Sequence, residues 1–522
     1  MLVKTRVSTN NHEVIVHAEQ PGNILEIIAQ AGIALDAPCA GLGRCGKCRV
    51  RVQGELPPDS VETALLSVEE ISEGIRLACR KRHIPRDLAI TIPPAPQEER
   101  IITAYGIVPV DIGVAIDLGT TSVVIAFINL SDGTIMAMHS ILNPQRTYGA
   151  DVVSRIKAGL DRGVLEKMMT LTVSSMTRDI EEMLSGIGLN ENRVKVIYIA
   201  GNTAMEHIIS GTDVSSLAKA PYKPVFTGMR NIQYLKSKPG ITGAEVRLFP
   251  LIAGFVGGDT VASILACGMD VSGETIALID IGTNAEIALG NSAGILVSSA
   301  PAGPAFEGGQ IRHGMRAQPG AIEDIHIVDD DVDLQVKGNA VPEGICGSGL
   351  IRIVAELVRS GVITEEGELL DAGHIEGNLS LRSVKKGDEQ AFVLYKSFDR
   401  EICLYQSDVR ALQLAKASIA TGLELLIERS GLKPERLYIA GAFGNYLNPD
   451  DLAFIGMIPP YLAGDTLFIG DSVISGLKRF IMNEPVVDMD RLLSEIRHIE
   501  LADDPAFNKK YLSMLALTPR VR

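Results

Sequence analysis

The sequence predicts a small α+β domain at the N-terminus, followed by a larger α/β body of two related lobes. Two observations predict this architecture. Four of the seven cysteines lie within the first 80 residues, and further along the chain two short motifs occur twice in the same order. A segment with three prolines, 93–96, is typical of a semi-rigid linker. We therefore expect an N-terminal domain at 1–95, a linker at 96–112 and a body at 113–522, with lobes at roughly 113–272 and 273–522.

Composition narrows the functional classes. The 522 residues are 46% hydrophobic, with a net charge of −15 and a pI of about 5.2. An acidic surface repels phosphate backbones and anionic lipid, so we expect neither nucleic acid nor a membrane surface as partner. No apolar run reaches the roughly 18 residues of a membrane span. The N-terminus lacks the basic-then-apolar layout of a signal peptide, so we expect a cytoplasmic protein. An odd cysteine count argues against a disulfide framework there.

The N-terminal region alternates short β-prone runs with one helical pattern. Turn-forming residues separate these runs, as expected for a small mixed domain. The expected elements are strands at 5–8 and 13–17 joined by a turn at Asn10 and Asn11, a helix at 23–31, and strands at 49–53 and 89–92.

The spacing of four cysteines predicts an iron–sulfur cluster. Cys39, Cys45 and Cys48 follow the pattern C-x5-C-x2-C, and Cys79 comes 31 positions after Cys48. Four thiolates hold the iron in such clusters. Structural zinc and uncoordinated thiols are the alternatives, but zinc sites usually use two closely spaced pairs and here only one pair is close. The first 95 residues resemble the β-grasp 2Fe–2S ferredoxins of plant type, with the longer first gap of the adrenodoxin-like branch.

The body contains an internal duplication. An Asp-x-Gly-Thr motif is followed by a Tyr-Ile-Ala-Gly motif, and both then recur in that order, which indicates two copies of one unit. The period is too long for a solenoid, so we expect two lobes facing a cleft. The first motif occurs as Asp117, Gly119, Thr120 and Thr121 and again as Asp280, Gly282, Thr283 and Asn284; the second occurs at 198–201 and 438–441.

These motifs suit phosphate binding. A glycine at a turn lets backbone amides approach phosphate, and threonine hydroxyls can donate to phosphate oxygens. The two aspartates repel phosphate but can hold Mg²⁺ through water. A strand ending in Gly441 and Gly444 leaves room for a flat adenine ring. Gly347 and Ser348 begin a helical stretch, where they either contact the nucleotide or simply turn the chain; both interpretations stay open.

In this order the segments resemble the superfamily of acetate and sugar kinases, heat-shock chaperone ATPases and actin. The resemblance covers roughly residues 113–480 and implies a two-lobed, ribonuclease H-like fold that binds ATP and Mg²⁺. The two Asp-x-Gly-Thr segments would then be the two phosphate loops. The remaining matches are a first connecting motif at 198–202, a second at 344–349 and an adenosine motif at 437–444.

A ferredoxin domain on such a body is similar to the reductive activators of corrinoid proteins. Residues 306–309, 408–416 and 469–472 also fit that group. The resemblance implies that the chain takes an electron from a low-potential donor and passes it to an inactive Co(II) corrinoid of a methyltransferase-system protein, with ATP driving a conformational step. It also implies a homodimer. The alternatives are an activator of another low-potential metalloenzyme, a small-molecule kinase, and a chaperone-like ATPase with a structural cluster.

Overall fold

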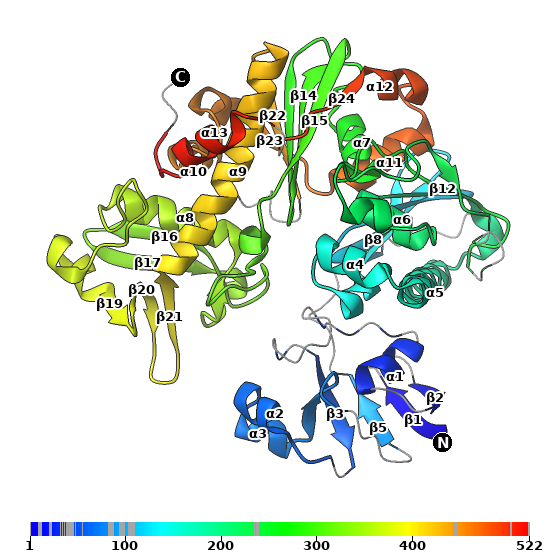
Figure 1. The fold of residues 1–522 in the computed structure, drawn as a ribbon, viewed down its shortest axis with the longest axis horizontal. Coiled ribbons are helices and arrows are strands. Elements are labelled where there is room, and N and C mark those ends of the chain that lie inside the picture. Colours follow the sequence, from blue (N-terminus) through cyan, green and yellow to red (C-terminus); the bar gives the residue numbers. More distant parts are fainter. Residues whose placement is uncertain are drawn as a thin grey trace. The chain divides into compact units, whose positions relative to one another are not determined.

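In the computed structural model, the described residues form five β-sheets (Figure 1). By its internal contacts the chain divides into two units, 1–262 with 477–486 and 263–476 with 487–522. The structure describes residues 2–8, 13–19, 23–31, 33, 35, 37, 46, 48–54, 56–81, 88–92, 100–102, 110–233, 235, 238, 240–441, 447–501 and 504–519.

The N-terminal domain is a β-grasp built on a five-stranded sheet of order β2-β1-β5-β3-β4. The first two strands pair antiparallel as predicted, and β5 joins β1 in parallel. The predicted turn at Asn10 and Asn11 lies outside the described residues. Helix α1 begins where predicted, because the Asn23 side chain accepts a hydrogen bond from the backbone N–H of Glu26. The elements are β1 (Leu2–Ser8), β2 (Glu13–Glu19), α1 (Ile24–Gln30), β3 (Arg49–Gln53), α2 (Ser60–Leu65), α3 (Val68–Ser72), β4 (Ile75–Leu77) and β5 (Leu88–Thr91).

The first lobe is built on a seven-stranded sheet of order β11-β12-β10-β7-β8-β9-β6. Strands β7, β8 and β9 form an antiparallel meander, and β10 then returns parallel to β7. The strands are β6 (Arg100–Ile102), β7 (Ile112–Leu118), β8 (Ser122–Asn129), β9 (Ile135–Leu142), β10 (Val194–Gly201), β11 (Arg230–Asn231) and β12 (Glu245–Leu248); the helices are α4 (Val152–Gly159), α5 (Arg162–Gly186), α6 (Thr203–Ile209) and α7 (Gly258–Ala266).

The second lobe repeats this plan in a six-stranded sheet of order β23-β22-β13-β14-β15-β24. Its strands are β13 (Ile276–Ile281), β14 (Ala285–Asn291), β15 (Gly294–Ala300), β22 (Arg436–Ala440), β23 (Thr466–Phe468) and β24 (Ile496–His498). Two smaller sheets adjoin it, β16 (Ala321–Val328), β17 (Asp331–Val336) and β18 (Gly344–Ile345), and β19 (Ser383–Lys386), β20 (Glu389–Lys396) and β21 (Glu401–Tyr405). The helices are α8 (Gly347–Arg359), α9 (Gln406–Ser430), α10 (Pro449–Phe454), α12 (Met489–Glu495) and α13 (Phe507–Ser513), while α11 (Ser472–Met482) is divided between the two units after Gly476.

The duplication predicted from the sequence is confirmed at the level of register. The order β9-β8-β7-β10-β12 in one sheet matches β15-β14-β13-β22-β23 in the other. Asp117 of β7 lies opposite Ala200 of β10, and Asp280 of β13 lies opposite Ala440 of β22. Both aspartates are therefore next to last in the first strand of their repeat, beside the end of a parallel strand. The two-lobed, actin-like fold class is confirmed.

Part of the predicted linker belongs to a sheet. Residues 100–102 form strand β6, which pairs antiparallel with β9, and Arg100 lies opposite His139. Residues 93–99 and 103–109 lie outside the described residues.

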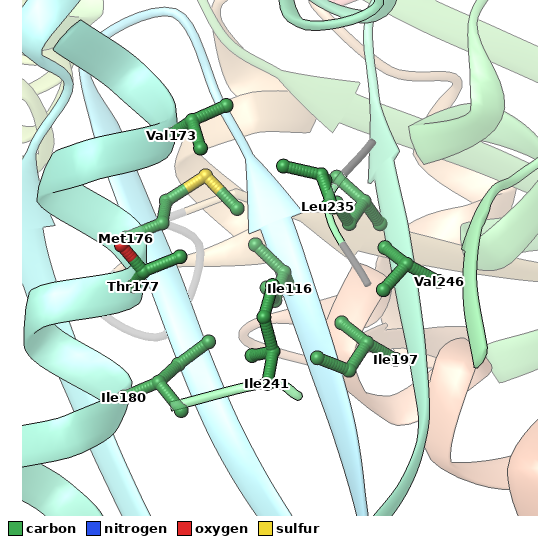
Figure 2. Close-up of a pocket in the computed structure, with 10 residues that line it drawn as sticks. Ile116, Val173, Met176, Thr177, Ile180, Ile197, Leu235, Ile241 and Val246 are labelled. Atoms are coloured by element: carbon green, nitrogen blue, oxygen red, sulfur yellow. The ribbon is translucent and has the colours of Figure 1, made fainter. Parts of the chain in front are cut away.

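The core of the first lobe lies between helix α5 and its sheet. Figure 2 shows Met176 and Ile180 of α5 facing Ile116 of β7 and Ile197 of β10. The cavity between them has a volume of about 10 Å³ and a lining of almost wholly aliphatic side chains. That is barely the room one water needs, so the cavity is a packing gap and not a ligand site. In the part of the chain that the structure describes, no helix is both long and apolar enough to cross a bilayer.

A buried ion pair stabilises the N-terminal domain. The side chain of Glu62 is fully buried and lies 2.5 Å from Nζ of Lys81. Glu62 also accepts a hydrogen bond from the backbone N–H of Leu77 at 2.8 Å, which ties α2 to β4. Removing one partner leaves the other charge buried and uncompensated, which is strongly destabilising.

We predict that Glu62→Ala lowers the free energy of opening of this domain by about 3–5 kcal/mol. The matched control is Glu73→Ala, because Glu73 pairs with Arg51 at 2.7 Å on the exposed surface. That change should cost less than about 1 kcal/mol. Hydrogen exchange of the β3 and β4 amides in the full chain measures both values. Equal effects of the two substitutions would contradict the assignment.

Candidate functional site

Two of the four predicted cluster ligands lie side by side at the end of a strand pair. Cys48 directly precedes β3, and Cys79 comes two residues after β4. The backbone N–H of Ala78 donates to the carbonyl of Cys48 at 2.9 Å, which holds the two segments together. Both side chains are buried, and their Sγ atoms are 3.3 Å apart. Cys39 and Cys45 lie outside the described residues.

This geometry fits two thiolates on one metal ion. A disulfide would bring the sulfurs to about 2.05 Å, far closer than observed. Two sulfurs bound at about 2.3 Å to one tetrahedral metal lie about 3.8 Å apart, close to the observed separation. In a 2Fe–2S cluster each iron takes two protein ligands. Cys48 and Cys79 are therefore close enough for both to bind one iron.

The first phosphate loop, residues 117–121, joins β7 to β8. A Cβ atom at Gly119 would lie 2.9 Å from the carbonyl oxygen of Ser122, so only glycine fits this turn. The carbonyl of Gly119 accepts a hydrogen bond from Nδ2 of Asn143 at 2.6 Å. The carbonyl of Thr120 accepts one from Nη2 of Arg155. Side chains outside the loop therefore fix its backbone.

The first connecting motif touches this loop directly. Nδ2 of Asn202 donates to Oγ1 of Thr120 at 3.0 Å, and Oδ1 of Asn202 accepts from the backbone N–H of Met205 at 3.1 Å. Because Oγ1 of Thr120 is the acceptor in this bond, the hydroxyl proton is directed elsewhere. Thr120 can thus donate to a phosphate oxygen, as the sequence predicts.

The second phosphate loop, residues 280–284, has a shorter turn and different partners: Ile281 pairs with Ala285, whereas Leu118 of the first repeat pairs with Val123. Oγ1 of Thr283 donates to Oε1 of Glu307 at 2.8 Å, so its proton is committed to a carboxylate. Oδ2 of Asp280 accepts from Oγ of Ser263 at 3.4 Å, and Ser263 lies 2.6 Å from the hydroxyl of Ser472. The two loops therefore differ in turn length and in donor chemistry. Sequence reasoning had treated both threonines as phosphate donors.

Glycines at the second connecting motif have a packing role. A Cβ atom at Gly347 would lie 1.9 Å from the carbonyl oxygen of Phe306, and one at Gly349 would lie 2.1 Å from that of Ile322. The start of α8 therefore packs directly against backbone. Ser348 is buried beside Cys346, with Oγ and Sγ 3.3 Å apart. Nucleotide contact by Gly347 or Ser348 stays a prediction.

The end of strand β22 leaves no room for a side chain. Gly441 has a φ of +108°, and a Cβ atom there would lie 2.5 Å from the carbonyl oxygen of Ile281. A larger residue at Gly441 would disturb the strand before it could block an adenine ring. Gly444 lies outside the described residues.

Three acids lie near these motifs: Glu206 is buried, and Asp259 and Asp471 are half-buried. Sequence analysis noted Asp471 only as part of 469–472 and did not identify the other two. Burial raises the pKa of Asp259, at the start of α7, and of Asp471, just before α11, each to about 6. Burial also raises the pKa of Glu206 well above its usual range. Oε1 of Glu206 accepts from the backbone N–H of Gly201 at 3.2 Å, which secures the first connecting motif. The sequence did hold a signal for Glu206, because this acid lies within a helix, α6, that is otherwise mostly apolar.

Three family models match successive parts of the chain. Residues 7–82 match the 2Fe-2S iron-sulfur cluster binding domain, 112–272 the RACo middle region, and 274–521 the C-terminal domain of RACo, the ASKHA domain. The corrinoid activation enzyme RamQ of Eubacterium limosum is 32% identical over 415 residues, covering 77% of this chain and 69% of that protein.

Two further relatives also match most of the chain. The [Co(II) methylated amine-specific corrinoid protein] reductase of Methanosarcina barkeri is 26% identical over 444 residues, covering 77% of this chain and 76% of that protein. A solved structure described as a reductive activator for corrinoid, iron-sulfur protein superposes with a TM-score of 0.69 at 26% identity, and covers 98% of each chain. The resemblance found in the sequence is confirmed: this chain belongs to the family of reductive activators of corrinoid proteins.

Proposed function

We propose that this protein is an ATP-dependent reductase that passes one electron to the Co(II) corrinoid of a methyltransferase-system protein and so restores Co(I). One observation carries the proposal: a single chain combines a buried cysteine pair suited to a cluster with a duplicated phosphate loop. Membership in the family supports the corrinoid as electron acceptor. The reaction balances as one electron lost by the protein and one gained by cobalt.

The cysteines serve as the cluster ligands in this proposal. A 2Fe–2S cluster supplies a one-electron carrier when bound by Cys39, Cys45, Cys48 and Cys79. Cys48 and Cys79 are buried, so they exclude water from their side of the site and keep the carrier in a low dielectric. Uphill transfer to a low-potential acceptor costs about 2.3 kcal/mol for each 100 mV.

The phosphate loops supply the nucleotide site in this proposal. Thr120 donates its hydroxyl proton to a phosphate oxygen, and Gly119 leaves the loop amides accessible. Asp117 and Asp280 orient water around Mg²⁺, while Thr121, Gly282 and Asn284 complete the two turns. ATP shifts the chain between conformations only if it binds one of them more tightly, and that difference would drive the electron transfer.

The cluster assignment predicts about two irons per chain in protein purified without oxygen. Cys45→Ser should lose the visible absorbance of the cluster and the ability to reduce a corrinoid protein. Cys267→Ser and Cys403→Ser are matched controls, because both residues are buried in the body and should leave the spectrum unchanged. Metal analysis measures the iron content, and absorbance spectra show whether the cluster is present. Zinc in place of iron, at one ion per chain, would contradict the assignment.

The nucleotide assignment predicts that the full chain binds Mg-ATP and Mg-ADP. Asp117→Ala and Asp280→Ala should each lower Mg²⁺-dependent ATP turnover about 10–100-fold, because each removes a group that orients the metal's water shell. Both variants should keep the iron content of the wild type. Calorimetry measures nucleotide binding, and phosphate release measures ATP turnover. Absence of adenine-nucleotide binding up to millimolar concentration would rule out the ATPase role.

A further inference from the structure

Two carbonyl groups of the first phosphate loop face the interior of the first lobe. The carbonyl of Gly119 accepts a hydrogen bond from Nδ2 of Asn143. The next carbonyl, that of Thr120, accepts one from Nη2 of Arg155. In a trans peptide the C=O and the following N–H point in opposite directions. The N–H groups of Thr120 and Thr121 are therefore directed away from Asn143 and Arg155. Both of these interior side chains are fully buried.

Arg155 links three segments with one guanidinium. It lies on α4, its Nε donates to the carbonyl of Gly149 at 2.9 Å, and its Nη1 lies 3.2 Å from Sδ of Met205 on α6. The third link is the bond to Thr120. Only a planar fork with donors on three nitrogens can serve three directions at once, so lysine is not an equivalent residue here.

The same neighbourhood fixes the side chain of Thr120. Asn202 holds Oγ1 of Thr120 as an acceptor, and Met205 fixes the orientation of the Asn202 amide through its backbone N–H. Met205 thus contacts Arg155 through sulfur and Asn202 through nitrogen. Main chain and side chain of Thr120 are set by one connected group of residues.

We propose that Arg155 is a positioning residue for the phosphate chain of an adenine nucleotide. It turns the amides of Thr120 and Thr121 toward the phosphates by holding the carbonyl behind them. The inference rests on the proposed nucleotide site and adds the residue that prepares it.

The test compares adenosine, ADP and ATP binding by calorimetry in the full chain. Arg155→Met keeps the bulk of the side chain and removes the donors. We expect ADP and ATP to bind about 10–100-fold more weakly, because hydrogen bonds that involve a charged group are the strong ones. Adenosine has no phosphates, so its affinity should change less than about twofold. A purely structural role would weaken all three ligands alike.

Met176→Ala is the matched control. Met176 is buried in the same lobe, but it lies at the cavity between α5 and the sheet (Figure 2). The Met176→Ala substitution should lower the thermal unfolding midpoint without changing the preference for ADP over adenosine. Arg155→Lys keeps the charge but not the fork, so we expect an intermediate loss of phosphate affinity. This variant decides the question if Arg155→Met does not fold.

The outcomes separate the two proposals. If the wild type binds none of the three ligands, the nucleotide site itself is wrong and the inference falls with it. If the wild type prefers ADP to adenosine and both Arg155 variants keep that preference in full, Arg155 does not position the phosphates and the inference alone is overturned. A selective loss of ADP and ATP affinity supports it.

Discussion

The close approach of two parallel strands, without a side chain between them, is the constraint on which both lobes depend. A Cβ atom at Gly201 would lie 2.6 Å from the carbonyl oxygen of Leu118, and one at Gly441 would lie 2.5 Å from that of Ile281. Gly201 is the last residue of β10, and Gly441 directly follows β22; these are the strands that pair with the first strand of each repeat. The aspartate of each phosphate loop therefore ends up beside an open strand end, which is where a ligand can reach backbone amides.

The two repeats share this backbone and differ in chemistry. The first loop is held from behind by a buried arginine and presents a threonine with a proton to donate. In the second loop the corresponding threonine, Thr283, donates to Glu307. Duplication places the two turns at corresponding strand ends, and the residues that surround them differ. A carboxylate, that of Glu307, lies at the second loop.

Much of the fold could be predicted because its signals are local. Cysteine spacing, the repeated motifs and the N-cap at Asn23 each act over a few residues, and the structure agrees with the hairpin, helix and strands they predict. Arg155 could not be found this way, because it lies 35 positions from the carbonyl it holds and only the packing of α4 brings them together. Strand β6 was missed because the prolines before it are typical of a linker.

The central claim is that nucleotide binding in the body changes electron delivery from the N-terminal domain. The most direct test measures the Co(I) absorbance of a methyltransferase-system corrinoid protein mixed with the reduced full chain at a mild driving potential, with and without Mg-ATP. We predict a higher Co(I) yield with ATP, and a loss of this gain in Asp280→Ala although its cluster is intact. The same yield with and without ATP, across several corrinoid partners, would contradict the account.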